Sequence, residues 1–266
     1  MQKKLSSVVA TCVVLALSAC SWLPAKTDET KNVPVTKLYA EARSEMESGQ
    51  YESAIKLWER LETNYPFGNY ATQAQMEIAY AHYKSQDQAQ ALAAADRFIR
   101  EHPTHPQVDY MYYLRGLISF NDQIGLLSQV YKQDPTERDP KATRESFAAF
   151  KVLVERYPTS RYAPDAIERM RYLTTAMAKY EVHVSNYYYR RGAYLASLNR
   201  AMSAVSDYQD APAREEALYL MIRNYDKLGM TELRNDTVRV FTANYPNSKF
   251  LTGGGSSEPW WKFWAK

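Results

Sequence analysis

Helix-sized amphipathic stretches of this chain end repeatedly in an aromatic residue or a histidine that is followed by proline. These closings are Tyr65-Pro66, His102-Pro103, Tyr157-Pro158 and Tyr245-Pro246, with a weaker one at Tyr208, whose proline is displaced to Pro212. The interval from Tyr65 to His102 is 37 residues, and the interval from Tyr208 to Tyr245 is 37 again. We interpret the two middle intervals, of 55 and 51 residues, as the same unit carrying extra residues.

A period in the thirties, with two helices in each unit, is typical of a tetratricopeptide-type solenoid. The sequence therefore predicts an all-α fold, a right-handed α-solenoid of about five helical hairpins. Sparse glycine, 9 residues in 266, fits a helical chain better than a β-rich one. The predicted repeats cover about residues 36–66, 70–103, 108–158, 162–208 and 213–246. Folds of this type offer extended surfaces to other proteins.

Apolar and small residues recur at helical spacing within the repeats, and this spacing predicts the core. The predicted core positions include Ala54, Trp58, Leu61, Ala91, Ala95 and Phe98. Gly49 lies between two predicted helices, where a left-handed backbone is often needed. Gly116 is a small residue at a predicted helix crossing, where it allows two helices to approach closely.

The first 19 residues have a basic start, an apolar middle and small residues at the end. This pattern predicts a secretory signal peptide, which is too short to span a membrane as a helix. The small residues run into Cys20, an arrangement that resembles a bacterial lipobox. The resemblance implies cleavage after Ala19 and acylation of Cys20, and Ser21 after the cysteine implies the outer membrane. An ordinary signal peptide followed by a chance cysteine is the alternative.

Segments of different composition flank the predicted solenoid of residues 36–250. Residues 20–35 contain Pro24, Pro34 and charges, and we expect a flexible tether there. An insertion, about residues 124–140, separates the helices of the third repeat. Residues 251–266 form a Gly/Ser linker and a tryptophan-rich tail. Tryptophan with lysine favours membrane–water interfaces, although such a tail could instead dock in a partner groove or have no function.

Charge and cysteine content exclude several classes of protein. The net charge is +3, and without Lys3 and Lys4 of the leader there are 31 basic and 30 acidic residues, which is about +1. A nearly neutral chain lacks the basic surface of a nucleic-acid-binding protein. Of the two cysteines, Cys12 leaves with the leader and Cys20 would be acylated, so no disulfide is expected.

No pattern in the sequence predicts catalysis, a cofactor or a metal site. The four histidines are His82, His102, His105 and His183, and no Asp/Glu cluster accompanies them. A phosphate-binding loop, an HExxH pattern and a Ser/His/Asp constellation are all missing from the sequence. We therefore expect a protein that is not an enzyme and that acts by binding.

Tyrosines and a polar cluster are the candidate binding residues. Twenty-two tyrosines are typical of surfaces that bind other proteins specifically, although this repeat type also places aromatic residues in its own core. The run Tyr187-Tyr188-Tyr189 cannot point inward as a whole from one helix, so at least one ring should be exposed. The densest polar cluster spans residues 96–106. In it, Arg100 could either complement a helix dipole or present its guanidinium to a peptide carboxylate.

The chain resembles the BamD (ComL) family, lipoproteins of the outer-membrane β-barrel assembly machinery. The matching stretches are Tyr65-Pro66-Phe67-Gly68, Asp96-Arg97-Phe98-Ile99-Arg100, His102-Pro103-Thr104-His105-Pro106, Arg115-Gly116-Leu117, Arg138-Asp139-Pro140, Ala178-Lys179-Tyr180-Glu181, Arg191-Gly192-Ala193 and Asn199-Arg200. They span about residues 38–246, whereas the tryptophan-rich tail lies outside the family pattern.

The resemblance implies a scaffold of five tetratricopeptide repeats, lipid-anchored to the outer membrane and facing the periplasm. Its first repeats would bind C-terminal segments of unfolded barrel proteins through Tyr65, Arg97 and Arg100. Its last repeats would dock a POTRA domain of the barrel-forming subunit at Asn199 and Arg200. Other assembly lipoproteins are further implied partners.

Two other functions are compatible with a helical-repeat lipoprotein. The first is a pilotin-like protein that escorts secretin subunits, since such proteins also carry tetratricopeptide repeats and a lipid anchor. The second is a cell-wall hydrolase built on an α-solenoid. A hydrolase would need a catalytic glutamate in a compact domain beside the solenoid, and the predicted repeats leave no room for one.

Overall fold

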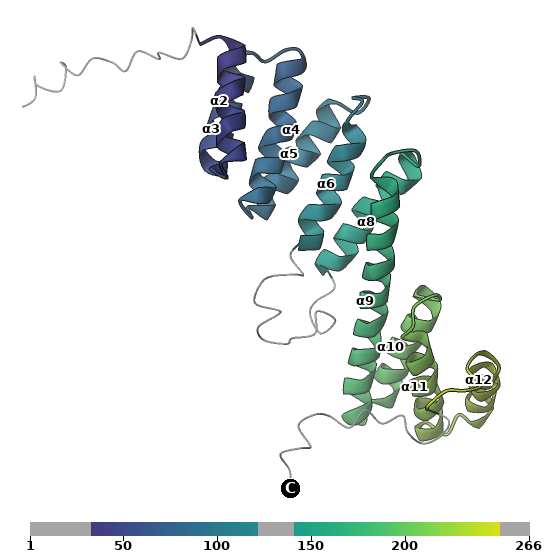
Figure 1. Ribbon diagram of the computed structural model, residues 1–266. Coiled ribbons are helices and arrows are strands. Elements are labelled where there is room, and N and C mark those ends of the chain that lie inside the picture. The colour runs from purple at the N-terminus through teal and green to yellow at the C-terminus, as the bar shows by residue number, and fades with distance from the viewer. Residues whose placement is uncertain (1–32, 122–140, 251–266) are drawn as a thin grey trace, which may run out of the picture. The chain divides into compact units, whose positions relative to one another are not determined.

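The computed structural model describes residues 33–121 and 141–250, and these residues form ten α-helices and no strand (Figure 1). The all-α fold of helical hairpins predicted from the sequence is thereby confirmed. The helices are α2 (Val35–Glu47), α3 (Tyr51–Asn64), α4 (Asn69–Lys84), α5 (Gln88–Glu101), α6 (Val108–Asn121), α8 (Lys141–Arg156), α9 (Ala163–Arg190), α10 (Tyr194–Asp207), α11 (Arg214–Lys227) and α12 (Thr231–Asn244). The predicted signal peptide, Cys20, nearly all of the predicted tether, the predicted insertion and the tryptophan-rich tail lie outside the described residues.

The chain divides into two compact units, and the division falls within α4, after Ala74. In the first unit, α2 packs against α3. Their contact buries small and large apolar residues that recur three or four positions apart on each helix. These residues are Leu38, Ala42, Ala54, Trp58 and Leu61. The core face predicted for the second helix is therefore confirmed.

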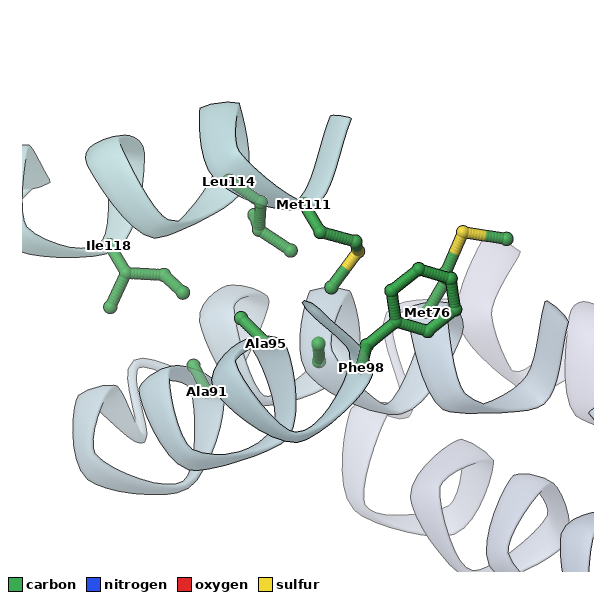
Figure 2. Packing of buried hydrophobic residues seen from close by; sticks show 8 residues of the cluster. Met76, Ala91, Ala95, Phe98, Met111, Leu114 and Ile118 are labelled. Atoms are coloured by element: carbon green, nitrogen blue, oxygen red, sulfur yellow. The ribbon is translucent and has the colours of Figure 1, made fainter. Parts of the chain in front are cut away.

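The second unit begins with a core shared by α4, α5 and α6 (Figure 2). Its buried members are Met76, Ala79, Ala91, Ala95, Phe98, Met111, Leu114 and Ile118. Helix α5 contributes two alanines and Phe98 at i, i+4 and i+7, which confirms the predicted core face. The small alanine side chains of α5 leave room for the larger side chains from α4 and α6.

Helix α9 connects two further cores of the second unit. Successive helices from α5 to α12 in this unit pack on their neighbours, and α9 packs on α8, α10 and α11. With 28 residues, α9 contributes Ala166 and Leu173 to a core that also contains Phe150. Further along the helix it contributes Val182 to a core that contains Leu220. A single helix therefore contributes to two packing layers.

The hairpin turns that the structure describes share one backbone geometry. Gly49, Gly192 and Gly229 have φ angles of 77°, 76° and 71°, which confirms the left-handed conformation predicted for Gly49. In the α2–α3 turn, the N–H of Gln50 donates to the carbonyl of Glu45 and caps the end of α2. The α4–α5 turn places Gln86 at the equivalent position with φ of 65°, although a residue with a Cβ rarely adopts this conformation.

Gly116 allows α6 and α8 to approach closely, as the sequence predicts. A Cβ built on Gly116 would lie 2.5 Å from Cδ1 of Phe150, which is closer than side-chain atoms can approach. The hydroxyl of Ser146 on α8 donates a hydrogen bond of 2.9 Å to the Gly116 carbonyl. This helix crossing therefore requires glycine, a residue without a side chain, at position 116.

Candidate functional site

Tyr65, the first predicted client-binding residue, lies at the C-terminal end of α3 in the first unit. Its backbone N–H caps the helix by donating to the carbonyl of Leu61. Its hydroxyl donates a hydrogen bond of 2.9 Å to the backbone carbonyl of Val33. The half-buried side chain of Tyr65 thus connects the end of α3 to the backbone just before α2, and its hydroxyl is already hydrogen-bonded.

Arg97 and Arg100 lie on α5 in the second unit, whereas Tyr65 belongs to the first. A spacing of three residues places the two arginines on one side of the last helical turns. Arg97 is half-buried, whereas Arg100 is exposed. Within residues 33–121 and 141–250, no hydrogen bond or salt bridge occupies the Arg100 guanidinium. This cation is therefore available to an anionic ligand and also complements the C-terminal dipole of α5.

Asn199 and Arg200, the predicted partner-binding residues, are brought together on α10 beside two open hollows. The first hollow, of about 380 Å³, is lined by Tyr188, Ala196, Asn199, Arg200 and Ser203. The second hollow, of about 540 Å³, is lined by Gly192, Ala193, Tyr194, Leu195, Ala196, Asn199 and Leu228. Asn199 and Ala196 belong to both linings, so the hollows adjoin. Together they give α10 a concave, partly apolar surface.

The Arg200 guanidinium also binds inside the chain. Its Nη1 donates a hydrogen bond of 3.1 Å to Glu181 of α9, whose side chain is buried. The Nη2 atom of Arg144, on α8, lies 3.9 Å from the other oxygen of the same carboxylate. Two arginines from two different helices therefore neutralise one buried acid of α9. Arg200 nevertheless keeps 43% of its side chain exposed, and this exposed part lines the first hollow.

Sequence reasoning did not assign a role to Glu181. The available signal was its position within an apolar face, because it lies between Ala178 and Val182 on the buried side of α9. A charged residue at such a position requires a partner, since an unpaired buried charge is strongly unfavourable. The sequence does not show that the partners come from α8 and α10.

A second buried polar group joins α9, α10 and α11. Ser185 donates to the carbonyl of Ser197 at 2.9 Å, and Asn224 donates from Nδ2 to the Ser197 hydroxyl at 2.8 Å. All three side chains are fully buried. These hydrogen bonds favour one alignment of the three helices, because breaking them would leave further buried polar groups unpaired.

In the predicted polar cluster, the side chains of His102 and His105 contact neighbouring residues of the second unit. The His102 imidazole hydrogen-bonds to Gln75 at 2.8 Å, and the His105 ring packs edge-on against Phe98. Partial burial, together with the nearby His102, lowers the pKa of His105 below its ordinary value of 6.5. His105 also lines an open hollow of about 610 Å³ beside Arg161.

Metal sites and membrane-spanning helices are both missing from residues 33–121 and 141–250, the part of the chain that the structure describes. There, no group of three histidine, cysteine, aspartate or glutamate side chains is arranged to hold a metal ion. None of the described helices is sufficiently long and apolar to cross a membrane. The predicted lipidation site, Cys20, precedes the described residues, so its role stays a prediction.

Comparison with known proteins assigns the family. The family described as YfiO, outer membrane lipoprotein, matches residues 31–240. The chain belongs to the YfiO family. Outer membrane protein assembly factor BamD of Neisseria meningitidis is 44% identical to it, over 94% of this chain and 96% of that relative. The protein of the same name from Vibrio cholerae is 36% identical, over 87% of this chain and 96% of that relative. The one from Xylella fastidiosa is 37% identical, over 86% of this chain and 78% of that relative.

Proposed function

We propose that this YfiO-family protein takes part in assembling β-barrel proteins into the outer membrane, as a scaffold that binds clients and the barrel-forming subunit. The observation that carries the proposal is the similarity, over 94% of the chain, to a relative named outer membrane protein assembly factor BamD. The same similarity favours this function over pilotin-like escort of secretins. The activity is binding, without a chemical step, so the protein is not an enzyme.

Client binding would use the exposed guanidinium of Arg100. A guanidinium can form two parallel hydrogen bonds with a carboxylate, such as the one that ends an unfolded barrel protein. Arg97, one helical turn earlier, adds positive charge on the same side of α5. In the first unit, Tyr65 would contribute an aromatic surface. Its hydroxyl already binds Val33, which supports a role for the ring and its neighbours rather than for the polar tip.

Partner binding would use the adjoining hollows of α10. Arginine and tyrosine side chains beside a concave apolar surface are typical of strong contacts between proteins. Arg200, Tyr188 and Tyr194 provide such side chains, and the exposed Leu195 provides an apolar contact. The proposed occupant is a POTRA domain of the barrel-forming subunit.

Lipidation of Cys20 would hold the scaffold at the periplasmic face of the outer membrane. Fatty chains add about 0.8 kcal/mol of membrane affinity for each buried CH₂ group. A protein fixed at the membrane that binds a client and the barrel-forming subunit together raises the effective concentration of each for the other. Further assembly lipoproteins would join the same complex.

The proposal is tested by capture of the barrel-forming subunit on the immobilised, lipidated protein from detergent-solubilised outer membranes. We expect wild type to retain this subunit and Asn199→Ala to retain several-fold less. Asn199 suits the test because it is exposed and makes no side-chain hydrogen bond in the described residues. Retention of a secretin in place of the barrel-forming subunit, or of neither, would overturn the proposal. The control variant is Arg171→Ala, which changes an exposed, ion-paired residue of α9.

A further inference from the structure

Phe250, the last described residue, is fixed to the side of α11. Its ring stacks on the ring of Tyr219, with ring centres 4.8 Å apart and ring planes inclined by 27°. Its backbone N–H donates a hydrogen bond of 3.2 Å to the hydroxyl of Ser248, which is a buried residue. The chain that follows α12 therefore returns to α11, and residues 251–266 continue from a defined point on that helix.

A row of stacked side chains leads from Phe250 to the second hollow beside α10. Arg223 of α11 lies over the Tyr219 ring at 5.7 Å and over the Tyr189 ring at 4.2 Å. Tyr189, on α9, contacts Tyr194 edge-on at 5.4 Å, and Tyr194 lines the second hollow. Together with the contact between Phe250 and Tyr219, these separations add to about 20 Å. The ring of Phe250 therefore lies no farther than this from the ring of Tyr194.

The second hollow is open and mostly apolar. Its volume of about 540 Å³ lies within the range of pockets that bind ligands. Leu195, one of its lining residues, is 58% exposed, so a large apolar side chain faces water there. Among the described residues that line this hollow, none carries a charge, and Asn199 supplies an amide. The hollow therefore suits a large apolar group that carries a hydrogen-bond donor.

We propose that the tryptophan pair of the chain's own C-terminal tail, Trp260 and Trp261, docks in the second hollow. Trp260 follows Phe250 by ten residues, which include the run Gly253-Gly254-Gly255-Ser256-Ser257. A flexible chain of ten residues has a root-mean-square length of about 16–19 Å, which matches the span set by the stacked row. A linker that matches its span gives the highest effective concentration, in the millimolar range. Docking therefore requires only a modest intrinsic affinity.

The chemistry of indole fits the hollow. An indole ring buries a large apolar surface, and its N–H requires an acceptor once water is excluded. The side-chain carbonyl of Asn199 is such an acceptor, and Leu195 provides apolar contact. The charged residues of the tail, Glu258 and Lys262, flank the tryptophan pair and keep their contact with water.

A docked tail competes with the barrel-forming subunit for the surface of α10. This consequence rests on the proposed function, which assigns a POTRA domain to the same hollow. The tail covers Leu195 while the partner is absent, and partner binding displaces the tail. Removal of the tryptophans therefore raises the fraction of the protein that is ready to bind, without changing the docking surface.

The test follows the tail by ¹⁹F NMR in the full mature chain labelled with 5-fluorotryptophan. Cys20→Ser removes the proposed acylation, so no detergent is needed, and Trp260→Phe and Trp261→Phe assign the two resonances. We expect both resonances to differ from their positions in a synthetic peptide of residues 251–266. Leu195→Glu should return them to the peptide positions, because a charge opposes burial of indole.

The matched control is Leu233→Glu, which places the same charge on an exposed leucine of α12 and should leave both resonances unchanged. Tail docking is wrong if the wild-type resonances coincide with those of the peptide, or if Leu195→Glu leaves them shifted. Resonances that move only when lipid vesicles are added would also overturn it, because the tail would then bind a membrane.

Competition is measured separately, by capture of the barrel-forming subunit from solubilised outer membranes. The double variant Trp260→Ser and Trp261→Ser should retain about two- to tenfold more of this subunit than wild type at limiting concentration. Unchanged capture by a protein whose tail docks would refute competition and leave the proposed function intact. If wild type captures no barrel-forming subunit, the proposed function fails, whereas tail docking is decided by the NMR positions alone.

Discussion

The guanidinium of Arg200 donates a hydrogen bond of 3.1 Å to the carboxylate of Glu181, a residue that is only 4% exposed. The residue that the family resemblance assigns to partner docking therefore also stabilises the fold. Arg144, at 3.9 Å from the same carboxylate, provides weaker compensation. A partner that binds Arg200 from the first hollow contacts a side chain whose position is already set by α9.

We expect Arg200→Ala to lower the free energy of unfolding by about 1–3 kcal/mol, because Glu181 keeps only the more distant Arg144. Adding Glu181→Gln should recover part of this loss, since a neutral amide costs less to bury than a charge. Urea unfolding followed by circular dichroism measures both. Arg239→Ala, which removes an exposed pair with Asp236, should cost about 1 kcal/mol or less. If Arg200→Ala matched wild type, the pairing with Glu181 would not stabilise the fold.

Gly116→Ala should destabilise the second unit by about 1–3 kcal/mol, because the new methyl group overlaps the Phe150 ring. Phe150→Leu removes the overlapping ring atoms, so the double variant should lose less stability than the sum of the two single changes. Thermal unfolding monitored by circular dichroism provides the comparison. Strict additivity would show that overlap with the Phe150 ring is not what destabilises Gly116→Ala.

Gln86→Gly should raise the free energy of unfolding by about 0.5–1 kcal/mol. Gln86 has φ of 65°, and the strain of a left-handed non-glycine residue exceeds the chain entropy that glycine loses on folding. Chemical denaturation at equilibrium measures the gain. The reverse change at a matched turn, Gly229→Gln, should cost stability. A destabilised Gln86→Gly would mean that the glutamine side chain contributes more than its backbone strain.

Stability should fall as the pH drops through about 6.5, in part because of His105. Partial burial and the charge of His102 lower the pKa of His105 in the folded protein, so the unfolded chain binds a proton first. The Nδ1 atom of His105 also accepts a hydrogen bond from the Gln107 backbone, which protonation would break. The contribution is complete above pH 7 and is lost as the pH falls toward the folded pKa. We expect His105→Gln to lose less stability than wild type between pH 7.5 and 5.5 in urea titrations, and an identical loss would rule out this role.

The sequence predicts the helices well because their determinants are local. Ala91, Ala95 and Phe98 mark one face of a helix by spacing alone, and that face is buried as expected. Gly49 predicts its turn because few other residues adopt its backbone conformation. Gln86 shows the limit of this argument, since the same turn forms there without a glycine.

The candidate sites depend on contacts that sequence spacing does not encode. The Glu181–Arg200 hydrogen bond joins two helices, and its formation depends on how α9 and α10 are rotated against each other. Likewise, the bond from Tyr65 to Val33 spans 32 positions and changes the role of the tyrosine hydroxyl. The exposure of Phe67 is a further result of tertiary structure, because an apolar residue beside proline could equally have been buried.

Client recognition through Arg100 is tested most directly by two versions of one barrel C-terminal peptide, with a free carboxylate and with an amide end. We expect the wild-type protein to bind the free carboxylate about tenfold or more tightly, because a charge-assisted hydrogen bond is lost on amidation. Arg100→Ala should bind both peptides with the weaker affinity, while Arg171→Ala behaves as wild type. Equal dissociation constants of wild type for the two peptides would contradict this recognition.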